Sequence, residues 1–76
     1  MEEFLTWVAR RLVDEPEAVR VETVETDEAT VLRLHVAPAD LGKVFGRHGR
    51  LARALRTLVR AGGGRAGRRT VLEIVE

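Results

Sequence analysis

Two glycines three positions apart frame a short basic segment, Gly46-Arg47-His48-Gly49, which joins two stretches of helical periodicity. At the start of the second helix several backbone N–H groups lack an intrahelical partner, and together with the helix dipole they attract an anion. Glycine has no Cβ, so a sugar–phosphate chain can approach this backbone closely. Arg47, His48 and the following Arg50 add positive charge and hydrogen-bond donors. The segment therefore predicts a phosphate-binding turn.

The helix after this turn, predicted over residues 50–60, has one apolar face and one basic face. At 100° per residue its arginines fall within about 120° of one another; they are Arg50, Arg53, Arg56 and Arg60. The other side should pack on a sheet; it holds Leu51, Ala52, Ala54, Leu55, Leu58 and Val59. Arginine suits forked contacts with phosphates and stacking on bases. A solvated basic face is the alternative, but the stripe starts at the glycine turn, which favours an anion-binding surface.

The residue types that the sequence lacks exclude most catalytic chemistry. There is no Ser, Tyr, Asn, Gln or Cys, which removes serine and cysteine nucleophiles, tyrosine acids and disulfides. The two histidines, His35 and His48, have no carboxylate three or four positions further along the chain, so they make a poor metal site. We therefore expect a noncatalytic protein without a metal or a cofactor.

Charge is unevenly distributed along the 76 residues. Residues 1–40 carry a net charge of −6 and residues 41–76 a net charge of +7, although the whole chain is close to neutral. A strongly basic half is the pattern of a protein that binds a polyanion. The length and the 45% apolar content predict one small domain over residues 1–76. No stretch is long and apolar enough to span a membrane, so we expect a cytoplasmic protein.

The hydropathy pattern and the turn residues predict an α+β fold. The predicted elements are a helix over residues 2–14, strands over 19–25 and 31–37, a short helix over 40–45, the helix over 50–60 and a strand over 70–75. Gly62, Gly63 and Gly64 should end the long helix, and Gly67 should extend the loop. In the first helix, the predicted core side chains are Phe4, Leu5, Val8, Ala9, Leu12 and Val13.

The order of these elements is α-β-β-α-α-β. The first two strands should form an antiparallel hairpin, and the two-helix crossover should return the last strand parallel to its neighbour. We therefore predict a three-stranded mixed sheet with three helices packed on one face.

Residues 42–55, with the glycine turn at 46–49, resemble the core of a KH domain, in which a helix, a G-x-x-G loop and an apolar-periodic helix follow one another. The element order resembles the type II, prokaryotic arrangement. The whole chain is similar to the KhpA family of small bacterial single-KH proteins. One departure is Phe45, because KH domains usually carry an aliphatic residue before the first motif glycine.

The resemblance implies single-stranded RNA as the ligand, with about four nucleotides lying in a groove. The implied RNA-binding residues are Lys43, Gly46, Arg47, His48, Gly49, Arg50 and Arg53. The implied groove floor is Leu41, Val44, Phe45 and Leu51, and the far wall is the middle strand around residues 34–36. His35 would either contact a base or have no role, and the second alternative is favoured.

The resemblance also implies an RNA chaperone that acts with a KH-containing, KhpB-like partner and is linked to the cell envelope and to cell-length control. The alternative function is a protein–protein interaction module that uses the fold as a docking surface. Trp7 lies off the predicted core-facing side of the first helix. Two interpretations of it stay open, a contact surface such as that of a homodimer, or a cap on the edge of the core.

Overall fold

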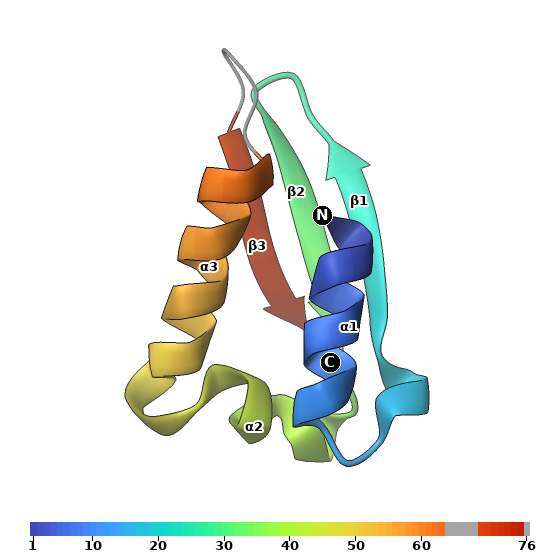
Figure 1. Cartoon of the computed structure of the whole chain (residues 1–76). Helices are drawn as coiled ribbons and strands as arrows, with labels where there is room; N and C mark the ends of the chain where they lie inside the picture. Colours follow the sequence, from blue (N-terminus) through green and yellow to red (C-terminus); the bar gives the residue numbers. More distant parts are fainter. Residues whose placement is uncertain (64–68, 76) are drawn as a thin grey trace.

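The computed structural model describes residues 1–63 and 69–75, and their order of elements is the predicted one (Figure 1). The helices are α1 (Glu2–Leu12), α2 (Leu41–Phe45) and α3 (Arg50–Gly63), and the strands are β1 (Arg20–Glu25), β2 (Ala29–His35) and β3 (Arg69–Val75). Single 3-10 turns lie at Pro16–Ala18, Pro38–Asp40 and Arg47–Gly49. Gly64 and Gly67, which were predicted to lie in the loop, are outside the described residues.

The strands form a mixed sheet in the order β1-β2-β3, as the crossover argument predicted. β1 pairs with β2 antiparallel and β2 pairs with β3 parallel, so that Thr23, Leu32 and Leu72 stand in one row across the sheet. Successive residues of a strand point to opposite faces. This row and the row through Val21, Leu34 and Ile74 therefore face the same way.

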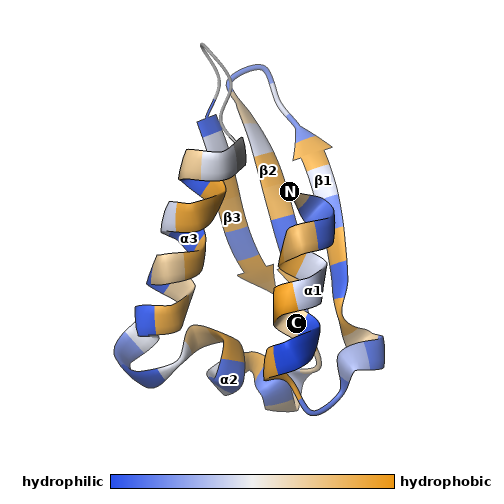
Figure 2. Ribbon diagram, viewed as in Figure 1, coloured by the Kyte–Doolittle hydropathy of each residue, from blue (hydrophilic) through white to orange (hydrophobic). Residues whose placement is uncertain are grey.

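The helices cover that face of the sheet. α1 packs on β1 and β2, while α3 packs on β3, and Figure 1 shows both helices in front of the sheet. Between the layers Leu5, Leu34, Val44 and Val59 are almost fully buried. Burying one such side chain contributes roughly 1.5–3 kcal/mol. Figure 2 shows the same arrangement as apolar colour on β2 and on the inner side of the helices.

α1 ends earlier than the sequence predicted, at Leu12 rather than at Asp14. The reason lies 26 residues away, in the buried carboxylate of Asp40. The Asp14 N–H donates to Asp40 Oδ1 at 3.2 Å, and the Glu15 N–H donates to Asp40 Oδ2 at 3.0 Å. Because these two N–H groups bond to Asp40, the chain leaves the helical path before Pro16.

The expected apolar faces of α1 and α3 are wider than the faces that are buried. Phe4 and Leu58 were predicted in the core, but they are 45% and 50% exposed. α3 also continues to Gly63 instead of ending at Arg60. At Gly62, a Cβ would lie 2.6 Å from Met1 Cε, so the end of α3 touches the first residue of the chain.

Candidate nucleic-acid interface

The glycine turn has an unusual backbone. Gly46, His48 and Gly49 have φ values of 73°, 57° and 71°, all in the left-handed region. A left-handed conformation is strained for most residues with a Cβ, although histidine tolerates it better than most. Non-glycine residues in this region are often found at binding sites, where the surrounding structure holds them in place.

The two glycines serve different purposes. A Cβ on Gly46 would lie 2.7 Å from Leu51 Cβ, so this glycine lets the turn pack against the first turn of α3. Around Gly49, a Cβ would meet nothing within 4 Å. The sequence predicted that a ligand could approach the backbone closely at both glycines. The space beside Gly49 is open to such a ligand, whereas the space beside Gly46 is filled by Leu51.

Fewer backbone N–H groups are available to a ligand at the start of α3 than the sequence predicted. The Gly49 N–H donates to Gly46 O at 3.2 Å, and the Arg50 N–H donates to Arg47 O. Two of the donors expected at the start of α3 are thus used inside the turn. The attraction of this end of the molecule for an anion depends more on side chains than the motif alone suggested.

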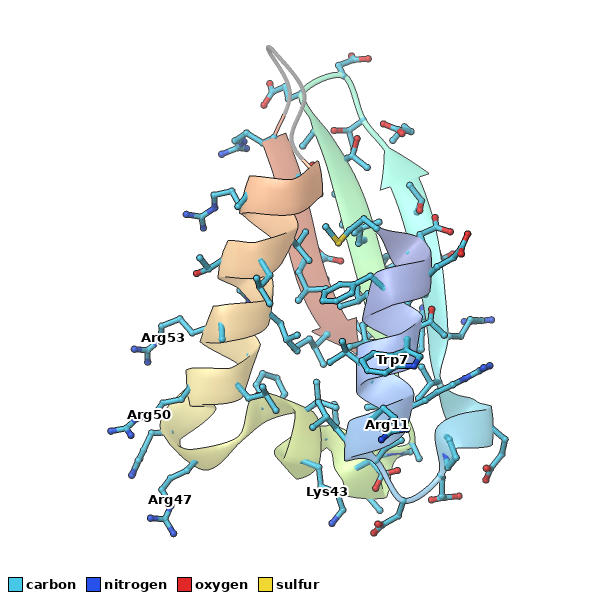
Figure 3. The ribbon with its side chains drawn as sticks, in the orientation of Figure 1. Trp7, Arg11, Lys43, Arg47, Arg50 and Arg53 are labelled. Carbon is cyan, nitrogen blue, oxygen red and sulfur yellow. The ribbon has the colours of Figure 1, made fainter. Side chains whose placement is uncertain are left out.

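The basic side chains of the turn, of α2 and of the first turns of α3 gather at one end of the molecule. Figure 3 shows Arg47, Arg50 and Arg53 pointing outward from the turn and from α3, on one side of the molecule. Arg47, His48, Arg50 and Arg53 are all exposed. Lys43 projects from α2 at the same end, and its Nζ lies 3.4 Å from Asp14 Oδ2. The residues that were predicted to hold phosphates are thus brought together.

The predicted groove floor is only partly accessible. Leu41, Phe45 and Leu51 are half-buried, and Leu41 and Leu51 pack against the core. Val44 has no exposed surface, so it belongs to the core beneath the site and cannot touch a ligand.

The expected far wall is wrong, because the middle strand is covered. Leu34 and Val36 are 0% and 3% exposed. His35 points to the opposite face of the sheet, where its Nε2 lies 3.0 Å from Glu22 Oε1. This hydrogen bond, helped by the nearby Arg33, holds the pKa of Glu22 below its ordinary value of 4.5. His35 is thus half-buried and paired with Glu22 on the face of the sheet away from the helices, whereas the favoured prediction was an exposed histidine without a role.

A separate, arginine-lined hollow lies beside α3. Its volume is about 400 Å³, and it lies between α3 and the edge strand β3. The lining residues are Arg56, Arg60, Arg69, Thr70, Val71 and Leu72. Sequence reasoning placed Arg56 and Arg60 on the basic stripe but missed Arg69. The predicted parallel return of the last strand was the signal that could have placed Arg69 near the end of the long helix.

Within residues 1–63 and 69–75, no three acidic or histidine side chains are grouped so that they could hold a metal ion. In the same described ranges, no helix has the length and apolar character that crossing a bilayer requires.

The α-β-β-α-α-β order, the mixed sheet and the glycine turn between α2 and α3 together define a type II KH domain, a noncatalytic class of protein. The family model for the KH domain of KhpA and KhpB matches residues 2–74. The chain belongs to this family, which confirms the resemblance drawn from residues 42–55 and from the element order.

Full-length relatives agree with this assignment. The RNA-binding protein KhpA of Aquifex aeolicus (strain VF5) is 46% identical over 76 residues, which cover 100% of this chain and 96% of that protein. The RNA-binding protein KhpA of Clostridium perfringens is 43% identical over 75 residues, 99% of this chain and 100% of the relative. The protein of the same name from Listeria monocytogenes is 42% identical over the full length of both. No solved structure matches the chain.

Proposed function

We propose that this chain is a noncatalytic protein that binds single-stranded RNA, with residues 1–76 acting as one KH domain. The observation that carries the proposal is the exposed basic turn at residues 46–49, held in a left-handed backbone at the start of an arginine-faced helix. Relatives that are 42–46% identical over almost the full chain are named as RNA-binding proteins. A KH domain clamps about four nucleotides with its G-x-x-G loop.

In this proposal the RNA backbone lies on the turn and continues along α3. Arg47, His48 and the open backbone at Gly49 contact the first phosphates, and Arg50 and Arg53 follow on the exposed side of the helix. Leu41, Phe45 and Leu51 offer partly exposed apolar surface to the bases. The hollow between α3 and β3 lies further along the same helix and has three arginines at its rim, so we extend the path of the strand into it.

The proposal is tested by replacing Arg47 and His48 together with Asp. Both side chains are exposed, and Asp tolerates the left-handed conformation at position 48, so the fold should be kept. Two carboxylates would then stand where a phosphate must bind. We expect the affinity for an unstructured oligoribonucleotide to fall by more than about a hundredfold, which corresponds to about 3 kcal/mol. Circular dichroism and thermal melting check the fold beside the binding titration.

A matched control separates a local effect from the change in net charge. Arg10→Asp together with Ala18→Asp makes the same charge change at two exposed positions outside the turn. This control should lower affinity only a few-fold, through the weaker overall field of the protein. If the folded Arg47/His48 variant binds RNA like the wild type, the turn is only a connection between helices and RNA binding by this site is rejected.

The roles that the family resemblance implied are part of the same proposal. We propose that the protein acts in the cytoplasm as an RNA chaperone with a KhpB-like KH partner, in processes that shape the cell envelope and set cell length. The family model covers the KH domains of both KhpA and KhpB, which supports a shared function.

A protein-docking surface is the second candidate function. It is favoured by the large apolar side chains that stay exposed on the helical layer, namely Met1, Phe4, Trp7 and Leu58. Exposed aromatic residues are enriched where proteins meet. We propose that this surface joins two copies of the chain into a homodimer, while the basic turn remains open to RNA.

A further inference from the structure

The buried carboxylate of Asp40 fixes the position of the turn that follows α1. Asp40 is 1% exposed, and its two oxygens accept hydrogen bonds from the backbone N–H groups of Asp14 and Glu15. Asp40 also stands directly before α2, the helix that leads into the basic turn. The segment after α1 is therefore attached to the base of the candidate RNA site.

This attachment uses the main chain of Asp14 and leaves its side chain free to point outward. The Asp14 side chain is 77% exposed, and its Oδ2 lies 3.4 Å from Nζ of Lys43. Lys43 is itself 45% exposed at the side chain, and Figure 3 shows it projecting from α2 at the end of the molecule that carries Arg47. The tertiary structure thus places the Asp14 carboxylate beside the ammonium group of Lys43, one of the cations of the candidate site.

The arginines of the candidate site differ from Lys43 in their ion pairs. Among the described residues, the ion pairs within 4.0 Å involve Arg33, His35 and Lys43, and none involves Arg47, Arg50 or Arg53. Within residues 1–63 and 69–75, Lys43 is therefore the one basic residue of the predicted set with a carboxylate oxygen within 4.0 Å.

A phosphate that reaches Lys43 meets this carboxylate. It must displace Asp14 from the ammonium group or bind with a second negative charge close by, and both alternatives weaken binding. An exposed pair of flexible side chains does little to orient Lys43 in return. We propose that Asp14 is an affinity-setting residue, which competes with the RNA phosphate for Lys43 and limits how tightly the site binds; this inference rests on the proposed RNA-binding function.

The test is the affinity of Asp14→Asn for an unstructured oligoribonucleotide at several salt concentrations. The Asp40 hydrogen bonds go to backbone N–H groups, so the fold should be unaffected. Because exposed ion pairs are weak, we expect binding to tighten by about two- to fivefold. The logarithmic salt dependence should also steepen, by up to about 0.7, as Lys43 becomes free to neutralise a phosphate fully.

Two further variants make the result specific to the pair. Glu28→Gln removes one carboxylate at the β1–β2 turn, at the opposite end of the molecule from α2 in Figure 1, and should leave affinity and slope nearly unchanged. In a Lys43→Ala background, Asp14→Asn should give no gain. The inference is overturned if Asp14→Asn binds no better than wild type, if Glu28→Gln gains as much, or if the gain persists without Lys43. Absence of RNA binding by the wild type itself would instead reject the proposed function on which the inference rests.

Discussion

At the scale of single residues, the turn at 46–49 combines a main chain with positive φ values and exposed basic side chains. Gly46 is required by the shape of the protein, because its φ is positive and Leu51 occupies the space beside it. Gly49 is required by φ alone. His48, at φ 57° and ψ 26°, adopts the left-handed helical region with a full side chain, whereas Gly46 combines its positive φ with an extended ψ of 179°. The two glycines of one motif therefore make different contributions to stability.

We expect Gly46→Ala to destabilise the protein more than Gly49→Ala. An alanine at either position adopts an unfavourable φ, which costs about 1–2 kcal/mol. At position 46 the clash with Leu51 should add roughly another 1–3 kcal/mol. For a domain of this size, the melting temperature of Gly46→Ala should then be about 10 °C lower than that of Gly49→Ala. Equal melting temperatures would show that Leu51 moves aside freely.

At the scale of elements, α3 connects the turn to the sheet. Its inner side holds Ala52, Leu55 and Val59 in the core, and its outer side carries arginines over its whole length. At its far end the helix lies beside β3, and Arg69 joins Arg56 and Arg60 around the hollow. One helix thus connects the proposed phosphate-binding turn with the proposed continuation of the RNA path.

Replacing Arg56, Arg60 and Arg69 together with Ala should weaken RNA binding without changing sequence preference. Phosphate contacts position a strand but do not read its bases. Arg60→Ala alone should have only a mild effect, whereas the triple variant should bind roughly tenfold more weakly and with a shallower salt dependence. The measurement is a titration with strands of four and of eight nucleotides. If the hollow holds the continuation of the strand, the longer strand loses more affinity; equal losses would contradict the proposed path.

At the scale of the whole molecule, the exposed Trp7 of α1 and the basic turn lie at different places on the surface (Figure 3). The first 40 residues are acidic and the remainder is basic, so charge is unevenly distributed along the chain although its net charge is +1. The exposed apolar side chains of α1 lie apart from the basic turn. Trp7 is 61% exposed, and the guanidinium of Arg11 lies 5.5 Å from the centre of its ring. This arrangement leaves room for a protein partner and for RNA on different surfaces.

Trp7→Ala should abolish self-association of the protein. A large aromatic side chain with an arginine over its ring is a common energetic centre of an interface. We expect sedimentation equilibrium to show a concentration-dependent dimer for the wild type and a monomer for Trp7→Ala. Val24→Ala, which removes an exposed apolar side chain from β1, is the control and should still dimerise. Identical monomers for wild type and Trp7→Ala would assign Trp7 to the edge of the core.

The order of the elements, the mixed sheet and the position of the basic turn were all predictable from the sequence. The element order and the position of the turn depend on local patterns, because helical periodicity, strand alternation and glycine positions act over a few residues. The mixed sheet followed from the rule that a helical crossover returns the next strand parallel. The glycine turn between the two helices followed from the positions of Gly46 and Gly49, and the arginine stripe followed from a repeat of three to four residues. The positive φ values of the turn came only from the structure.

Only the tertiary structure decided which of these residues meet. α1 ends at Leu12 because Asp40, far along the chain, takes the next N–H groups. Phe4 and Leu58 are exposed because the sheet is covered by two separate helices, whose flanks extend beyond the surface that the strands bury. The Asp14–Lys43 pair and the place of Arg69 beside α3 are likewise set by packing between elements distant in sequence. Local periodicity tells which side of a helix is apolar, but the distance to its neighbours fixes how much of that side is covered.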